Sequence, residues 1–265
     1  MKKRLLAILL SLMMILSLLP VGVFAENEGN TVANALPDAV DGTITLTSDV
    51  ALSNWNSVNS DTIIDLANHT LELTEKKTVT VAEGKRLTIK NGSIVAKASG
   101  LTGTEAVFAA GKDATITFDN VQMETTGAAL FPAGNAAAVN VLNSYIKAGT
   151  YAVGTNANVK GGVLEFSNNI KITLKDSQFT STGYTNNDGD TCTVMINVPG
   201  ELNVDNCEIT GRRQAVLVRG GTANIENSKI TLSDPYTGSD AGSYDEKVWG
   251  QGNNLPMAAL VVGNR

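Results

Sequence analysis

The feature that most constrains this chain is a short motif that occurs seven times. Each copy reads apolar, polar, apolar, a further residue that is usually polar, and then Asn or Asp, and another apolar residue follows three positions later. Apolar residues at alternate positions are typical of a β-strand with one buried face. The motif therefore predicts a strand, a turn and a second strand, with the turn at Asn68, Asn91, Asn120, Asn143, Asp176, Asn206 and Asn227.

The spacing of the copies points to stacked units. Successive turn residues are 23, 29, 23, 33, 30 and 21 positions apart, and all 21 inward positions of the motif are apolar. A further apolar strand precedes each copy and is usually followed by Gly. These strands lie at residues 78–81, 106–109, 129–131, 163–166, 193–198, 215–218 and 258–262. A unit of this length cannot bury its inner face alone, so we expect the units to stack and to pair strand on strand.

The fold class that follows is all-β: a single-stranded right-handed parallel β-helix of about seven to eight three-strand coils. A sandwich would need antiparallel hairpins at shorter intervals, and the Leu frame of a leucine-rich repeat is absent. In a β-helix the turn residues would stack as an internal amide ladder, each side chain bonding the ones above and below. Asp176 would interrupt it, because a carboxylate is an acceptor without a donor, either as a local irregularity or as a site with a shifted pKa.

The first 25 residues are predicted to be a secretory signal peptide. Met1 is followed by three basic residues, then by a 15-residue apolar run that ends at Leu19, and small residues precede a cleavage point after Ala25. A membrane anchor is the alternative, but the run is shorter than the ~20 residues that a spanning helix needs. We expect a mature leader at residues 26–40, a capping coil at 41–60 and the β-helix over 41–265.

The C-terminal sequence predicts an incomplete last coil. Residues 257–262 begin a new coil and the printed chain stops at Arg265, as in a truncated gene or a fragment. The alternative is an open end that stacks on another chain, because exposed strand edges pair readily. We otherwise expect a monomer.

Charge and cysteine content narrow the partners. Removal of the signal peptide takes away three basic residues and no acid, which changes the net charge from −6 to −9. A chain so acidic lacks the basic surface that nucleic acids require. The register places Cys192 and Cys207 on different predicted sheets, which favours two packed thiols over a disulfide, although an exported protein can hold either.

Several segments resemble a known group of proteins. Residues 65–71 (DLANHTL), 87–92 (LTIKNG), 214–221 (QAVLVRGG) and 257–265 (MAALVVGNR) are similar to coils of pectate-lyase-like right-handed β-helix surface proteins from gut-dwelling Gram-positive bacteria. The resemblance covers residues 40–265. It implies the fold and an extracellular or cell-surface location, and many such proteins are adhesin-like, while the same superfamily includes polysaccharide lyases and hydrolases.

The variable loops between coils are the predicted binding region, because loops on a rigid scaffold often carry function. They hold Tyr151 and four candidate binding aromatics, Tyr184, Tyr236, Tyr244 and Trp249. Such rings can stack on sugars or anchor a protein partner, or they can pack onto the scaffold. Three arginines, Arg212, Arg213 and Arg219, are expected to cluster near the outer face of the upstream strands, where they would bind a carboxylate or solvate a turn.

Metal binding and catalysis have weaker signals. The run 186–190 contains Asp188 and Asp190, oxygen ligands of the kind that calcium takes, but the pattern is also ordinary turn chemistry. No other cofactor is indicated. In the lyases that the chain resembles, acids on the outer face of the upstream strands hold calcium; here we expect only Glu165, with Asn197 and Arg219 as polar neighbours. The single histidine, His69, belongs to the first turn motif, and we interpret it as structural.

Three functions remain, in order of preference. The first is a secreted or cell-surface β-helix binding module, adhesin-like and non-catalytic, which presents its loops to a glycan or to a host or bacterial surface protein. The second is a polysaccharide lyase or glycoside hydrolase that acts on acidic polysaccharide. The third is a structural spacer within a larger surface protein.

Overall fold

The computed structural model describes residues 32–97, 106–156, 158–160, 163–182, 192–212, 214–233 and 258–263. The chain divides into two compact units, Met1–Asn30 and Thr31–Arg265, and all described residues belong to the second. Their secondary structure is entirely β. Among these residues there is no helix of the length and hydropathy that crossing a membrane requires. The predicted signal peptide lies outside the described residues.

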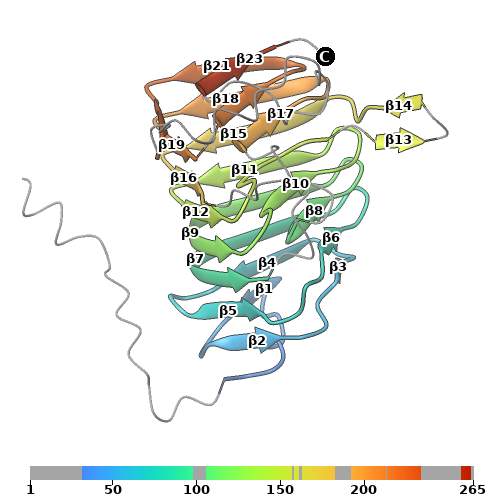
Figure 1. Cartoon of the computed structure of the whole chain (residues 1–265). Coiled ribbons are helices and arrows are strands. Elements are labelled where there is room, and N and C mark those ends of the chain that lie inside the picture. Colours follow the sequence, from blue (N-terminus) through green and yellow to red (C-terminus); the bar gives the residue numbers. More distant parts are fainter. Residues whose placement is uncertain are drawn as a thin grey trace, which may run out of the picture. The chain divides into compact units, whose positions relative to one another are not determined.

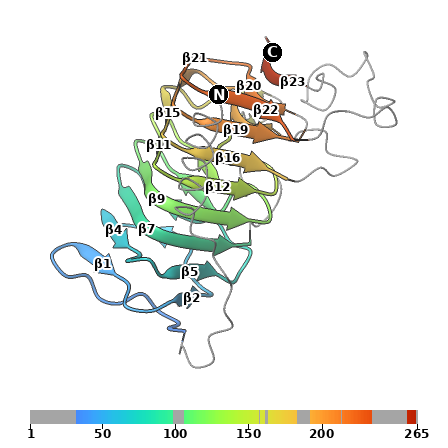
Figure 2. The same ribbon diagram turned by 90° about the vertical axis from the view of Figure 1, so that its left-hand side faces the viewer.

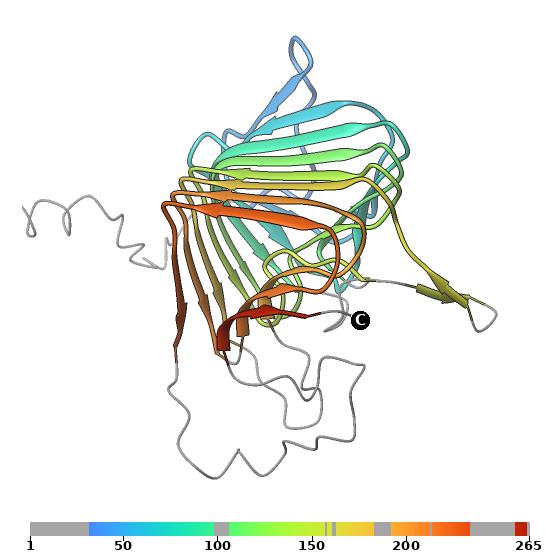
Figure 3. The ribbon, with the colours of Figure 1, turned by 90° about the horizontal axis from the view of Figure 1, so that it is seen from above.

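Two adjoining rows of parallel strands form the larger part of the structure (Figure 1). The row that we call the first arm contains β1 (Thr43–Thr45), β4 (Thr62–Asp65), the first halves of β7 (Arg86–Ala96) and β9 (Thr115–Thr125), β11 (Ala138–Leu142), β15 (Ile170–Lys175), β18 (Gly200–Asp205) and β21 (Thr222–Glu226). The second arm contains β2 (Val50–Leu52), β5 (Thr70–Leu73), the second halves of β7 and β9, β12 (Tyr145–Ala148), β16 (Gln178–Ser181), β19 (Glu208–Gly211) and β22 (Lys229–Leu232). Because β7 and β9 run through both arms, the arms make one 14-stranded sheet that folds at the corner between them (Figures 2 and 3).

A third row of parallel strands completes each turn of the chain. It contains β3 (Ser57–Val58), β6 (Val79–Val81), β8 (Phe108–Ala110), β10 (Leu130–Pro132), β17 (Cys192–Ile196), β20 (Gln214–Val218) and β23 (Ala258–Val262). Val153 links its two sheets, since it bridges in parallel to Leu130 on one side and to Val194 on the other. The chain thus passes through first arm, second arm and third row in a recurring order. Stacked parallel strands of this kind, predicted from the motif, are confirmed.

One predicted strand is wrong. We expected residues 163–166 to enter the third row, but the structure gives that place to Val153. Residues 163–165 form β14 (Val163–Glu165), which pairs antiparallel with β13 (Asn158–Lys160) and projects from the stack (Figures 1 and 3). The register pairs Asn158 with Glu165 and Lys160 with Val163.

The core lies between the arms and the third row. Of the 21 positions predicted to face inward, 18 are buried, and the other three, Ala223, Ile225 and Ile230, are partly buried and pack against the core. Phe108 provides the main aromatic contacts, edge-to-face with Phe118 at 5.4 Å and with Trp55 at 5.8 Å between ring centroids. Such contacts add about 1 kcal/mol each to the apolar burial.

The glycines at the turn after the third row are required mainly by close packing between layers. A Cβ on Gly134 would lie 2.1 Å from the Lys112 nitrogen in the preceding layer, and one on Gly200 would lie 2.4 Å from the Ile170 oxygen. Only Gly84 and Gly221 of these turn glycines have a positive φ, 70° in each. The predicted Gly turns are therefore confirmed. Glycine is needed there more often because a side chain would collide with the preceding layer than because the backbone has a positive φ.

The two ends of the described stack differ. At the start, Ala33 pairs in parallel with Val50, and Val40 and Thr43 exchange hydrogen bonds around Asp41 and Gly42, both in the left-handed region. Backbone groups at that edge therefore have partners. In β23, by contrast, Leu260 and Val262 pair with the core residues Val216 and Val218 and yet are 45% and 73% exposed.

A candidate binding groove at the Asn corner

The corner between the arms is built from the predicted turn residues. All seven lie in the left-handed region, with φ between 49° at Asn143 and 69° at Asn68. Asn and Asp enter this region at lower cost than other residues with a Cβ, because their short side chains bond locally. The corner residues are thus selected first for backbone conformation.

The predicted internal amide ladder is wrong in its position and in its partners. Most of the corner side chains are exposed. From Asn91 onward each corner amide donates to the preceding layer, but commonly to an aspartate beside the corner: Asn91 to Asp65 at 3.1 Å, Asn143 to Asp119 at 2.9 Å and Asn227 to Asp205 at 3.0 Å. The left-handed backbone turns these side chains outward, where a carboxylate is the stronger acceptor.

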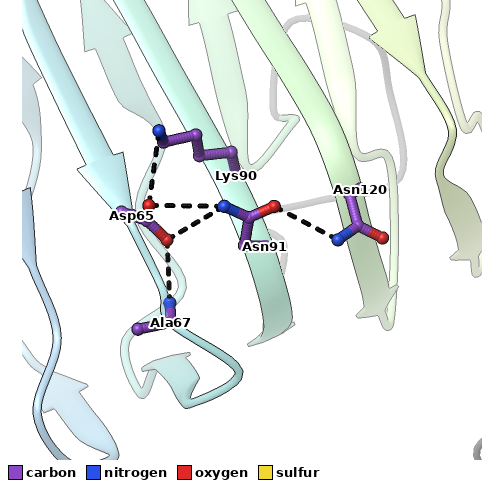
Figure 4. Close-up of polar contacts among 5 residues, drawn as sticks. All are labelled: Asp65, Ala67, Lys90, Asn91 and Asn120. Atoms are coloured by element: carbon purple, nitrogen blue, oxygen red, sulfur yellow. Dashed lines mark hydrogen bonds and ion pairs between the residues drawn. The ribbon is translucent and has the colours of Figure 1, made fainter.

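The first part of this outer ladder is the most densely bonded. The Asp65 carboxylate accepts the Ala67 backbone N–H, the Asn91 amide and the Lys90 ammonium, and Asn91 in turn accepts from Asn120 at 3.2 Å (Figure 4). Burial alone would raise the pKa of Asp65, but these donors outweigh it and hold the pKa below its ordinary value. Asp65 is therefore a structural carboxylate.

A second ladder lies just inside the corner, at the residue after the turn in the four layers from Asn143 to Asn227. The Ser144 hydroxyl accepts the Val121 N–H, the Ser177 hydroxyl accepts the Ser144 N–H, and the Ser228 hydroxyl accepts the Cys207 N–H, all at 3.0 Å. Each of these hydroxyls also donates to the carbonyl two residues earlier in its own layer. The Cys207 thiol donates in the same way to Asp205, so Cys207 occupies a serine position in this inner ladder.

Neither cysteine forms a disulfide, in agreement with their predicted placement on different sheets. Cys192 is buried in the third row and Cys207 is buried at the corner. Burial raises the pKa of the Cys207 thiol, and the nearby Asp176 and Asp205 carboxylates raise it further. The thiol is therefore protonated at neutral pH.

The corner opens into a groove in its C-terminal part. A depression of about 390 Å³ is lined by equivalent residues from three successive layers: Asp176, Ser177, Gln178, Asn206, Cys207, Glu208, Asn227 and Lys229. Asp176 accepts the Asn206 amide at 2.7 Å, and Glu208 pairs with Lys229 at 2.7 Å. The lining combines acceptors, amides and one cation, and its volume suits a small ligand.

An aromatic residue, Tyr145, lies one layer before the N-terminal end of this groove. Tyr145 is partly exposed on the outer face of β12 and is paired in register with Gln178 of the groove on one side and with Gln122 on the other. Gln122, Tyr145 and Gln178 thus form an outward column in register on the second arm, the row of strands that faces the viewer in Figure 2. Sequence reasoning missed Tyr145 because it sought aromatics only in the loops. The available signal was its place two residues after Asn143, an outward position of the repeat.

Most residues predicted to bind a ligand lie outside the described residues: Tyr184, Asp188, Asp190, Arg213, Tyr236, Tyr244 and Trp249. Arg212 and Arg219 are both described and partly buried, but they lie at opposite ends of β20. The whole of β20 lies between them, and at a rise of about 3.3 Å per residue this strand alone spans about 13 Å. The predicted cluster that includes both is therefore wrong, because an extended strand separates them.

Two further predicted outer residues are packed. Tyr151 is buried in an apolar cluster over the third row. Of the two alternatives for this ring, ligand binding or packing onto the scaffold, the structure shows packing. Asn197 is also buried; its N–H donates to the Thr155 hydroxyl at 2.8 Å, and that hydroxyl donates back to its side-chain oxygen. Glu165 belongs to the β13–β14 hairpin and to none of the stacked rows.

Within the described ranges, no group of three or more His, Cys, Asp or Glu residues is placed to hold a metal ion. Comparison of the chain with protein-family models, with curated proteins and with solved structures finds no match. The class of protein is therefore defined by the observed architecture alone, an all-β stack of parallel strands that carries a polar groove at one corner.

Proposed function

We propose that this chain is a non-catalytic, adhesin-like glycan-binding module of a secreted or cell-surface bacterial protein. Its scaffold would be a right-handed parallel β-helix of the pectate-lyase-like kind. The recurring order of parallel strands supports the fold, and connections between parallel strands of one sheet are right-handed in nearly all proteins. The predicted signal peptide supports export.

The observation that carries the glycan proposal is Tyr145 at the head of the groove. Sugar recognition needs an apolar ring face and directional hydrogen-bonding groups close beside it. Tyr145 offers the ring in the layer next to the depression, in register with Gln178, while Gln178, Asn206 and Asp176 offer amide and carboxylate oxygens within the depression. This arrangement favours a glycan over a protein partner, because the groove lining contains no large apolar side chain to anchor one.

The third row gives less support to a lyase. In the pectate-lyase-like enzymes that this chain resembles, acids on the outer face of the equivalent row hold calcium. In this chain Phe131, Met195 and Leu217 form a buried apolar cluster there. Catalysis on acidic polysaccharide is accordingly the weaker reading, and a structural spacer is favoured by no specific contact.

A glycan array probed with the exported chain, with and without calcium, tests the proposal. We expect saturable binding that falls at least tenfold in Tyr145→Ala and stays within about threefold in Tyr145→Phe, which keeps the ring. Thr117→Ala, on the first arm, is the control and should bind normally. Absence of glycan binding, or release of unsaturated product from acidic polysaccharide, would overturn the proposal.

A further inference from the structure

The groove is longer along the stack than across it. Each of its layers contributes residues from the corner to the second arm, such as Asp176 to Gln178, and at about 3.3 Å per residue that is a width of about 7 Å. Along the stack the lining runs from β16 through β19 to β22, strands that pair in register. Tyr145 and Gln122 extend the same outward column beyond the groove.

The column is in unbroken register over five strands. Gln122 pairs with Tyr145, Tyr145 with Gln178, Gln178 with Glu208, and Glu208 with Lys229. Parallel neighbours lie about 4.8 Å apart, so the column is about 19 Å long. One sugar ring has about the length of one such step, and a linear glycan along this column would meet a new side chain with nearly every ring.

Hydroxyl and amide groups flank the column on both sides. Thr180, Thr210 and Thr231 are in register on the second arm, and the last two share a hydrogen bond of 3.0 Å. On the corner side, Asn206 and Asn227 direct their amide hydrogens to the preceding layer. Their side-chain oxygens are then acceptors for hydroxyl groups in the groove.

The charges beside the column disfavour acidic chains. Asp176 and Glu208 line the groove, and the neighbouring row of the first arm holds Lys175, Asp205 and Glu226 in register. These four acids outnumber the two lysines beside them, Lys175 and Lys229. Lys229 is the groove's cation, and Glu208 already pairs with it. A polysaccharide with one carboxylate per ring would place like charges a few ångströms apart.

From these observations we infer that the ligand is a linear glycan without carboxylates, bound in single file along the stacking direction between Gln122 and Lys229. The inference rests on the proposed glycan-binding function and adds the ligand's charge class, its orientation and the number of rings bound.

A length series tests it. Affinities would be measured by calorimetry for β-1,4-linked N-acetylglucosamine and glucose oligomers of one to six rings, and for galacturonate oligomers of the same lengths. In the better-bound neutral series, we expect Kd to fall at least tenfold between two and five rings and to change less than twofold from five to six. Galacturonate oligomers should bind at least tenfold more weakly.

Variants at the two ends provide the matched control. Gln122→Ala and Lys229→Gln should each weaken the hexamer about threefold or more and weaken it more than the dimer, whereas Tyr145→Ala should weaken both equally and Thr117→Ala, outside the column, should weaken neither. Equal affinity for dimer and hexamer, or preferred binding of galacturonate, would overturn this inference and leave glycan binding intact. Failure of every oligomer, together with a silent array, would instead remove the proposed function.

Discussion

Two stretches of the same corner serve different purposes. The closed stretch runs from Asp65 through Asn91 to Asn120, and the open stretch runs from Asp176 through Asn206 to Asn227. Their turn residues share the left-handed backbone, with φ of 58° at Asn91 and 51° at Asn206. The backbone of the corner is therefore constant, and the difference arises from side chains.

In the closed stretch the residue after Asn91 is the small Gly92 and the residue after Asn120 is the apolar Val121, and Asp65 gathers three donors. In the open stretch that position holds Ser177, Cys207 or Ser228, and the next holds the long side chains Gln178, Glu208 and Lys229. The long side chains form one wall of the groove and the corner side chains form the other. A repeat can thus keep its stability in one region and acquire a binding surface in another by changing two positions per layer.

The largest expected effect comes from Gly92→Ser in the closed stretch. A Cβ at Gly92 would lie 2.5 Å from the Leu66 Cβ and 2.6 Å from the His69 oxygen, although serine is the native residue at the same position of the open stretch. We expect a loss of about 3 kcal/mol in the free energy of unfolding, measured in urea. Ser228→Ala, the matched change, should cost only about 1 kcal/mol; equal losses would contradict the difference in packing.

Asp65→Ala should have the next largest effect. It removes the acceptor of the Ala67 N–H and of two side chains, for which we expect a loss of about 2 kcal/mol. Asp205→Ala is the counterpart in the open stretch and removes an acceptor of the Asn227 amide, so we expect about 0.5 kcal/mol. A larger loss in Asp205→Ala would reverse the proposed ranking of the two stretches.

Acid should reduce the contribution of Asp65, in the closed stretch, to the free energy of unfolding. The folded pKa of Asp65 is below its unfolded value of about 3.9, so its contribution is present above that pH and is lost as the pH falls through the folded pKa. The difference in unfolding free energy between the wild type and Asp65→Ala should therefore narrow between pH 6 and pH 2. A difference that stays constant over this range would show that the carboxylate charge is not responsible.

Alkali should weaken the open stretch. Burial raises the folded pKa of Cys207 above its unfolded value of about 8.5, so above that pH the unfolded chain loses its proton first and stability falls as the pH rises towards the folded pKa. The wild type should lose stability relative to Cys207→Ser between pH 8.5 and pH 10, with Cys192 retained in both. Parallel curves would exclude Cys207 as the cause.

The smallest effect is expected from Asp176→Asn. The carboxylate cannot donate to the preceding layer, whereas an amide at this position can reach Asn143 as Asn120 reaches Asn91. We expect a gain of about 0.5 kcal/mol in stability. Chemical denaturation in replicate would detect it, and a loss of that size would mean that the Asp176 charge itself stabilises the corner.

Much of the scaffold could be predicted from the sequence because burial imposes a strict alternation. Ile64, Ile116 and Leu202 are buried as expected, and every predicted turn residue has a positive φ. The error at residues 163–166 arose because hairpin strands and stacked strands share the same composition. Val153, alone between polar and small residues, gave no comparable pattern.

The candidate site was harder to predict because it depends on register between layers. Tyr145, Gln178 and Glu208 are ordinary outward residues when each is considered alone. Only the pairing of β12, β16 and β19 places them in one column beside the corner. The outward direction of the corner amides likewise follows from the left-handed backbone, which a strand pattern does not reveal.

The most direct test of this account is a map of amide chemical shifts in the purified chain, titrated with whichever β-1,4-linked hexamer, of N-acetylglucosamine or of glucose, binds more tightly. The account predicts that the largest shifts fall on residues 121–124, 144–147, 177–180, 206–210 and 227–231, in a band across successive layers of the second arm. Shifts concentrated in residues 183–191 and 234–257, or on the third row, would contradict it and place the ligand on the variable loops instead.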